Sequence, residues 1–461
     1  MSVTEVLSRS DIIRQFRHSR SGLAGIFLLL ALILMSLYAA VAVPLESFRQ
    51  WNNPIFWADL PQSAAPAWTN IGFGPKSAEH IVLRTDDASI SSSSEGGVRT
   101  VTHSYSINYG FDTYPKDFMI IYSARYGSTQ PALQVDVQRP DGNEFRIYFA
   151  SLRPSQQGEK EFVRIFSTDR LVADELRKYT GLFTYPPDYN RPHVMIFSDT
   201  QENRVLKGTY TIRETFYLFD TADSVRDSGF ILGGVYGIIG TDDLRRDLSV
   251  GILWGAPVAL FIGLTVAIAA IVIGLIYGVI AGYKGNRTDE GLMRINDIFY
   301  SLPTLPLLII LSVTIGRSIF LITGFLVIFG WVGMAKISRS LALQIKNLQY
   351  VEAAKLMGQS DFKIITKHII PQLLPLTFAS IAISVPSAIL GEAALSFLGL
   401  SDPSIPTWGQ ILHDANTAGA ASRGLWWWIV PPGLMIALTG LAFVLIGNAL
   451  DAIVNPRSRK R

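Results

Sequence analysis

Few residues in this sequence have the types and spacing that chemistry requires. The 461-residue chain contains no cysteine, and its six histidines show no metal-ligand spacing such as H-x-x-x-H. No G-x-S-x-G elbow and no H-E-x-x-H motif occurs in it. The neighbouring acids Asp86 with Asp87 and Asp174 with Glu175 have the character of solvated surface charge. The sequence therefore predicts no catalytic residue and no protein-bound metal.

The most informative polar segment is the loop 336–371, which is too polar to cross a membrane. Apolar residues recur in it at every third position: Leu348, Val351, Ala354 and Met357. Gly358 follows, so the pattern predicts a short helix over 350–358 with one narrow apolar stripe that can dock into a groove of another protein. A helix lying on lipid is the weaker interpretation, because aligned alanines bury little apolar area.

Long apolar runs dominate the elements around this loop. The chain is 49% hydrophobic and only 17% charged, whereas soluble domains carry about 25% charged residues. Residues 23–43 are uncharged and would form a helix about 31 Å long, enough to cross the hydrocarbon core of a bilayer. Further apolar runs predict spans at 250–282, 301–316, 318–335, 373–395 and 428–447. The predicted fold class is an α-helical polytopic membrane protein with six transmembrane helices.

The Lys and Arg residues predict the orientation of these spans. They are concentrated in 1–22, between the second and third spans, in the loop 336–371 and in the tail 452–461. By the positive-inside rule these segments are cytoplasmic, so both termini are expected inside the cell. The formal net charge of +3 gives no reason to expect a nucleic-acid partner.

The second span carries glycines at a helical spacing of four. Gly274, Gly278 and Gly282 share one face of the predicted helix. Because glycine has no side chain, another helix backbone can approach this face closely. We expect these residues to serve helix packing.

Three polar or aromatic residues near the outer ends of the spans are candidates for the transport pathway. Glu392 lies inside the fifth span, where an ionised side chain must be paired or must face water. We favour a structural contact for it over a substrate or proton role. By the predicted topology Asp242 and Trp408 lie at the outer mouth, where we expect a structural role first and a role in lining a gate second.

Residues 44–239 differ in composition from the spans and predict an extracytoplasmic β-rich domain. Residues 101–109 alternate between apolar and polar side chains, as a half-buried strand does. Segments 133–137 and 145–149 alternate on either side of a Pro-Asp-Gly-Asn turn, which predicts a β-hairpin. Further strands are expected at 118–123, 162–166, 193–198 and 208–218, with a helix at 170–179 and a loop at the Ser-rich stretch 89–94. These elements suggest a sandwich-like binding or spacing module.

The loop 336–371 resembles the E-A-A-x-x-x-G loop of ABC importer permease subunits, in particular the dipeptide, oligopeptide and nickel permeases. The residues that match are Glu352, Ala353, Ala354, Gly358 and, in the apolar element that closes the loop, Pro371. Other segments match in order and spacing, among them Gly240-Thr241-Asp242, Gly282-Tyr283, Ile389 to Gly399 and Pro406 to Gly409. The resemblance covers about 1–43 and 240–457, whereas 44–239 lies outside it.

The resemblance implies a type I ABC importer-like core at 240–451, in which the 336–371 loop holds a coupling helix seated on an ATPase subunit. Tyr350 and Lys355 would then belong to the ATPase-coupling set with the matching residues. The chain has no G-x-x-x-x-G-K-[ST] phosphate loop, so we expect a transport subunit that is not an enzyme and binds no cofactor. ATP and Mg would be held by the partner subunits.

The partners implied are a second homologous permease subunit, two ABC ATPase subunits and an extracytoplasmic solute-binding protein, assembled in a prokaryotic inner membrane. This chain would form half of the translocation pathway. The resemblance implies peptides or similar small solutes as the cargo, while nickel chelates, sugars and opines remain open. The domain 44–239 is expected to receive or steer the solute-binding protein, by analogy alone.

Two other classes of function compete with this interpretation. A membrane-tethered extracellular sensor would work through the β-rich domain and would need no ATPase, but it leaves the E-A-A loop unexplained. An ion-driven secondary transporter would need several ionisable groups at mid-membrane, where Glu392 stands nearly alone.

Overall fold

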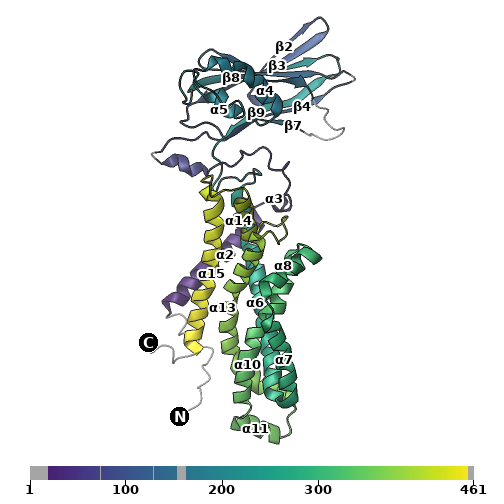
Figure 1. The fold of residues 1–461 in the computed structure, drawn as a ribbon, viewed down its shortest axis with the longest axis vertical. Coiled ribbons are helices and arrows are strands. Elements are labelled where there is room, and N and C mark those ends of the chain that lie inside the picture. Colours follow the sequence, from purple (N-terminus) through teal and green to yellow (C-terminus); the bar gives the residue numbers. More distant parts are fainter. Residues whose placement is uncertain (1–18, 73, 128, 153–161, 455–461) are drawn as a thin grey trace. The chain divides into compact units, whose positions relative to one another are not determined.

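The computed structural model describes residues 19–72, 74–127, 129–152 and 162–454, so much of the predicted cytoplasmic ends 1–22 and 452–461 lies outside the described residues. The chain divides into two compact units (Figure 1). One consists of Asn53–Ser249, and the other combines Met1–Asn52 with Val250–Arg461. We describe each unit by itself.

The second of these units is helical. Its elements are α2 (Arg20–Ala42), α3 (Leu45–Arg49), α6 (Leu248–Lys284), α7 (Asn286–Ser301), α8 (Thr304–Ile315), α9 (Ile319–Gly330), α10 (Val332–Ile345), α11 (Gln349–Leu356), α12 (Asp361–Ile364), α13 (Ile370–Phe397), α14 (Trp408–Thr417) and α15 (Trp426–Val454). A π-helical turn at Ile365–Ile369 joins α12 to α13. The Ser19 hydroxyl caps α2 by accepting the Gly22 N–H at 3.1 Å.

Hydropathy and length identify the helices that can cross a membrane. Within the described residues these are Arg20–Ala42, Leu248–Lys284, Ile319–Ile345, Asp361–Phe397 and Trp426–Ile453. The predicted span 301–316 differs from these, because α8 is about 18 Å long and too short to cross alone. It follows α7 across a bend of 78°, and Pro303 lies at the break. Six spans result if this bent pair counts as one.

Apolar side chains cover the outside of the helical unit as well as its interior. Phe27 is 71% exposed and Leu34 is 55% exposed, both on α2. Such a surface is costly in water but suits a lipid solvent. Inside the unit, α2 packs closely on α15. The gap at Gly25 has no room for a side chain, since an added Cβ would lie 2.8 Å from the Ala442 carbonyl oxygen.

The unit Asn53–Ser249 consists of two antiparallel sheets with short helices (Figure 1). Its strands are β1 (Ile81–Arg84), β2 (Ser89–Glu95), β3 (Val98–Tyr109), β4 (Asp117–Arg125), β5 (Ala132–Gln138), β6 (Glu144–Ser151), β7 (Val163–Phe166), β8 (Gly208–Leu218) and β9 (Ser224–Gly233). The sheet orders are β1-β9-β4-β7 and β2-β3-β8-β5-β6. Side chains from both sheets form one aromatic-rich core that includes Tyr105, Phe118, Phe145, Phe216 and Phe230. This confirms a β-rich, two-sheet region separate from the helices.

Most of the predicted strands are present, and the hairpin is confirmed. Strands β5 and β6 pair antiparallel, and in their turn the Arg139 N–H donates to the Asn143 carbonyl at 2.9 Å. Two predictions were wrong. The stretch 89–94 is strand β2, which pairs with β3 along its whole length; both of its faces are exposed, so no alternation marks it.

The predicted strand at 193–198 is instead a helix, α5 (Pro192–Phe197). Pro192 occupies the first turn, where its fixed φ and missing N–H favour helix initiation. A short apolar run does not by itself distinguish a strand from a buried helix. The predicted helix at 170–179 is present as α4 (Arg170–Leu176), followed by a 3₁₀ segment, Arg177–Leu182.

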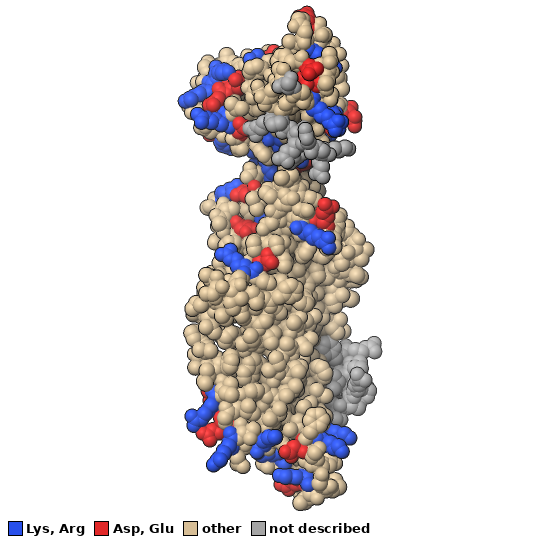
Figure 2. Space-filling view, turned by 90° about the vertical axis from the view of Figure 1, so that its right-hand side faces the viewer, with Lys and Arg blue, Asp and Glu red and all other residues tan. Residues whose placement is uncertain are grey.

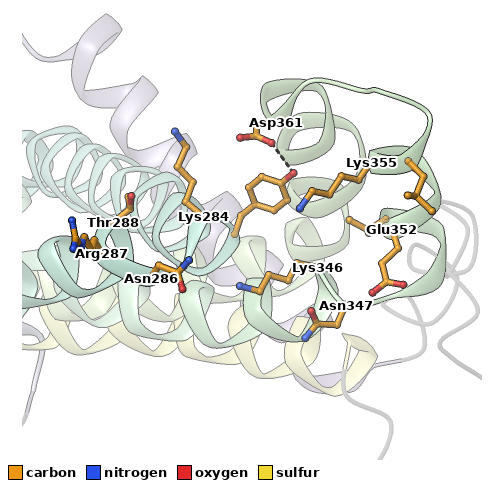
Figure 3. A pocket seen from close by; sticks show the side chains of 13 residues that line it. Lys284, Asn286, Arg287, Thr288, Lys346, Asn347, Glu352, Lys355 and Asp361 are labelled. Atoms are coloured by element: carbon orange, nitrogen blue, oxygen red, sulfur yellow. Dashed lines mark hydrogen bonds between the residues drawn. The ribbon is translucent and has the colours of Figure 1, made fainter.

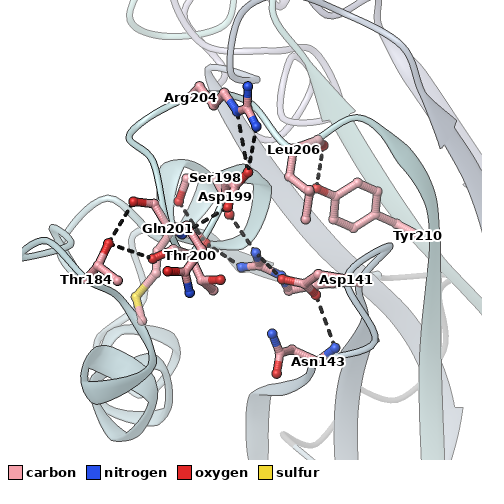
Figure 4. Close-up of polar contacts among 12 residues, drawn as sticks. Asp141, Asn143, Thr184, Ser198, Asp199, Thr200, Gln201, Arg204, Leu206 and Tyr210 are labelled. Carbon is pink, nitrogen blue, oxygen red and sulfur yellow. Dashed lines mark hydrogen bonds and ion pairs between the residues drawn. The ribbon is translucent and has the colours of Figure 1, made fainter.

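A buried arginine, Arg139, joins α5 to the hairpin, and two of its partners, Asp141 and Ser198, are labelled in Figure 4. Arg139 donates to the carbonyls of Met195 at 3.2 Å and Ser198 at 2.6 Å, and to the Asp141 carboxylate at 2.9 Å. Its guanidinium also stacks on Phe145, 4.6 Å from the ring centroid. Because these partners stabilise the buried charge, Arg139 holds the hairpin and α5 in one arrangement.

Candidate functional site

The helix predicted at 350–358 is present as α11, and its two halves face different surroundings. Val351 and Ala354 are buried at 2% and 1% exposure, in a cluster with Leu275 of α6, Ile345 of α10 and Ile364 of α12. Two of the four residues of the predicted stripe, Val351 and Ala354, therefore pack against the chain itself, whereas Met357 is exposed. The stripe is thus only partly exposed, because periodicity shows which residues share a face but not what covers the face, and docking through this helix stays a prediction.

The surface that α11 leaves uncovered lies at its C-terminal end and just beyond it. Leu356 is 89% exposed, Met357 73% and Phe362 75%. Gly358 adopts φ +77° and turns the chain between these residues, a backbone conformation that favours glycine. We call Leu356, Met357 and Phe362 the apolar tip. Met357 belongs to the predicted stripe, whereas the helical period did not reveal Leu356, which lies outside the stripe, or Phe362, which lies beyond the end of α11.

The remaining residues of the predicted coupling set surround this helix. Glu352, Ala353, Lys355 and Pro371 are exposed. The Tyr350 hydroxyl accepts a hydrogen bond from the Gln372 side chain, next to Pro371, and partial burial raises the pKa of Tyr350. The structure thus brings the two ends of the predicted motif together at the base of α11.

The glycines of the second span lie where α6 meets α10. A Cβ added at Gly274 would lie 2.5 Å from the Trp331 carbonyl oxygen, and one at Gly282 would lie 2.5 Å from that of Arg339. One at Gly278 would overlap the Ala335 carbonyl oxygen. The Ser338 hydroxyl donates to the Gly274 carbonyl at 3.0 Å. These contacts hold α6 directly against α10, the helix that precedes α11 in the chain.

An ion pair joins α7 to α10. The Arg339 guanidinium donates to both carboxylate oxygens of Asp289, with Nη2 at 2.6 Å from Oδ2. Such a two-bond pair fixes orientation as well as distance. Helices α6, α7 and α10 are therefore joined by backbone contact and by this pair.

Glu392 and Trp408 are buried in the helical unit. The Ser396 hydroxyl donates to Glu392 Oε1 at 2.5 Å, so Glu392 has the partner that an acid inside a span requires. The Trp408 indole N–H donates to the Ile252 carbonyl at 3.0 Å, and a Cβ added at Gly409 would lie 2.7 Å from Ala393 Cα. The segment that begins α14 thus packs between α6 and α13.

Asp242, the third predicted gate residue, belongs to the other unit, Asn53–Ser249. Asp242 is fully buried and pairs with Arg246 at 2.5 Å. It also accepts the Leu244 N–H at 2.9 Å and the Arg246 N–H at 2.8 Å. These bonds close the turn that leads into α6, which indicates a structural role.

A pocket of about 1380 Å³ opens beside α11 (Figure 3). It is lined by the α6–α7 junction, the end of α10, one side of α11 and the start of α12. Its basic lining residues are Lys284, Arg287, Lys346 and Lys355, and its acidic ones are Glu352 and Asp361. The Tyr283 hydroxyl donates to Asp361 at 3.0 Å, the dashed line in Figure 3. Within the described residues, no group of His, Asp or Glu side chains is placed to hold a metal ion.

Comparison with known proteins identifies the helical part of the chain. Residues 270–460 match the model of the binding-protein-dependent transport system inner membrane component. The dipeptide transport system permease protein DppC of Bacillus subtilis is 39% identical over 48% of this chain and 69% of its own length. The oligopeptide transport system permease protein OppC of Haemophilus influenzae is 38% identical over 49% of this chain and 71% of its own.

A solved structure of the MetNI methionine ABC transporter, inward facing, covers 46% of this chain and 97% of its own at 20% identity, with a TM-score of 0.37. That likeness supports no further conclusion. The identity to the peptide permeases, over more than two thirds of their length, is decisive. The chain belongs to the family of membrane permease components of binding-protein-dependent ABC importers.

Proposed function

We propose that this chain forms half of the pathway of an ATP-driven importer and is moved by ATPase subunits that seat on the apolar tip. The observation that carries the proposal is the combination of an exposed tip, Leu356 with Met357 and Phe362, and a helix behind it whose inner face, Val351 with Ala354, is buried in the chain's own core. An exposed apolar group of this size favours a protein partner.

Movement of α11 would reach the spans through packed contacts. Val351 and Ala354 lie in the same cluster as residues of α6, α10 and α13. A force on the tip is therefore transmitted to three of the candidate membrane spans, which are Leu248–Lys284, Ile319–Ile345 and Asp361–Phe397, as rigid-body switching requires. The path for solute would form between this chain and a second, homologous permease subunit.

The orientation we propose places both termini and α11 in the cytoplasm. Figure 2 shows a band without Lys, Arg, Asp or Glu along the helical unit, with blue Lys and Arg and red Asp and Glu both below and above the band. Exposed cations at the α11 end include Lys284, Arg287, Lys355, Lys363 and Lys367, and the positive-inside rule assigns that end to the cytoplasm. The unit Asn53–Ser249 would then be extracytoplasmic.

Peptides are the cargo we propose, because the most similar relatives reported above are named as dipeptide and oligopeptide permeases. An extracytoplasmic solute-binding protein would deliver them. ATP and Mg would be bound by the ATPase subunits. Family membership favours this function over a tethered sensor or an ion-driven transporter.

Truncation of the tip tests the proposal. In vesicles that contain the assembled importer, Leu356→Ala with Phe362→Ala should lower ATP-driven peptide uptake at least about tenfold, since two buried anchors contribute more than about 1.4 kcal/mol. The matched control is Leu34→Ala with Phe27→Ala, two exposed residues of α2, which should leave uptake within about twofold. Equal uptake by the two variants would refute the role of the tip.

A further inference from the structure

The pocket beside α11 collects positive charge from segments far apart in the sequence. Lys284 ends α6, Arg287 begins α7, Lys346 follows α10 and Lys355 lies on α11. In Figure 3, the ammonium groups of Lys346 and Lys355 both point toward the middle of the pocket. Only Glu352 and Asp361 carry negative charge among the lining residues. The chain therefore presents an excess of cations in one concave place.

Three of these cations lack a carboxylate partner in the part of the chain that the structure describes. Lys284, Arg287 and Lys355 make no ion pair there, whereas nearby Arg294, Lys336 and Arg339 are all paired. Lys346 donates to the Gly282 carbonyl at 2.9 Å, which holds its charge at the α6–α7 junction. An anionic group that enters the pocket would therefore meet cations that no carboxylate of the described chain already neutralises.

The pocket is continuous with the apolar tip. Leu356 belongs to the tip and also lines the pocket. A partner that buries the tip must therefore also face the cations. Among possible occupants, the ATPase surface that seats the tip is the one that this continuity and the charge favour.

We propose that the ATPase subunit inserts an acidic segment into this pocket, so that its contact with the permease has an apolar part at the tip and an electrostatic part at Lys284, Arg287, Lys346 and Lys355. The inference rests on the proposed function. Its consequence is that the ATPase holds α11 and the α6–α7 junction at once. Closure of the ATPase would then move both as a unit.

The test measures affinity for the purified cognate ATPase subunits, with the full chain in nanodiscs of phosphatidylcholine, at about 50 mM and about 500 mM salt. The test variant is Lys284→Gln with Arg287→Gln, which leaves α11 intact. The control is Lys363→Gln with Lys367→Gln, which removes the same charge from exposed residues that do not line the pocket. We expect the test variant to bind about five- to tenfold more weakly than wild type at low salt and equally at high salt.

Carbodiimide coupling of the wild-type complex gives an independent result, because it joins a lysine only to a carboxylate in direct contact. We expect bonds from Lys284, Lys346 or Lys355 to ATPase Asp or Glu residues. If wild type binds the ATPase and the test variant binds it with the same affinity and the same salt dependence, the inference is overturned and the proposed function stands. Loss of phosphatidylglycerol binding by the test variant without loss of ATPase affinity would overturn it in favour of a lipid headgroup. Failure of wild type to bind the ATPase would instead refute the proposed function.

Discussion

At the scale of single residues, the most unusual group is a carboxylic acid sealed inside the β-rich unit. Glu214 on β8 is fully buried and lies opposite His103 of β3 in the sheet register. The Tyr105 hydroxyl donates to Glu214 at 3.4 Å and lies 2.7 Å from the Ser228 hydroxyl. Burial raises the pKa of Glu214 to about 8 and lowers that of His103. Both groups are therefore neutral at pH 7.

These shifts predict how the stability of the unit depends on pH. Between the ordinary pKa of Glu214 and about 8, the folded chain binds a proton that the unfolded chain has released, so the free energy of unfolding falls as pH rises. The slope is at most about 1.4 kcal/mol per pH unit. His103 has the opposite effect on stability. Below its ordinary pKa the unfolded chain binds a proton that the folded chain does not, so the free energy of unfolding falls as pH falls.

Hydrogen exchange of β8 amides in the full chain, corrected for intrinsic rates, measures this dependence from pH 6.5 to 8. As pH rises across that window, the protection of the wild-type β8 amides against exchange through global unfolding should fall. Glu214→Gln keeps the shape of the side chain but does not titrate, and it should remove the slope. A slope that persists in the variant would show that another group controls it.

At the scale of elements, the close approach of α6 and α10 links α11 to the membrane. The backbone of α10 fills the space that a side chain at Gly278 would need. Gly278→Ala should therefore separate the helices or strain them, which costs about 1–3 kcal/mol, and should lower uptake with the ATPase still bound. Gly324→Ala is the control, because nothing lies within 4 Å of its added Cβ and alanine favours a helix. Melting temperature and uptake of the two variants would be compared, and equal behaviour would exclude a role for this contact.

Elements were predictable where local chemistry alone decides them. The hairpin β5–β6 followed from alternation and turn residues, and α2 followed from its uncharged length. Strand β2 was missed because its serines face solvent on both sides and only its partner β3 specifies it. Of the exposed tip, only Met357 was in the predicted stripe, for a related reason: whether Val351 or Leu356 is covered depends on residues distant in the sequence.

At the scale of the whole molecule, a permease core carries a large inserted unit. The family match begins at residue 270, and the unit Asn53–Ser249 has its own core and its own sheets. An insertion that folds by itself can add a binding function without changing the core. We propose that it receives the solute-binding protein.

Excision of 60–225 tests that proposal. The shortened chain should still assemble with the ATPase subunits, while the Kd of its assembled importer for the binding protein should rise at least about tenfold because the docking surface is lost. A fall in ATPase assembly would show misfolding, so assembly serves as the control. An unchanged Kd would remove the docking role from the inserted unit.

The central claim is that α11 and its tip form the contact through which ATPase subunits drive this permease. The chain has no native cysteine, so a single cysteine at exposed Ala353 or Leu356 can be cross-linked in the intact membrane complex without background. Each should capture the ATPase subunit, and capture should change with bound nucleotide, whereas cysteine at exposed Leu34 of α2 should capture none. Absence of an ATPase product from Ala353 and Leu356, in a complex that still imports peptide, would contradict the account.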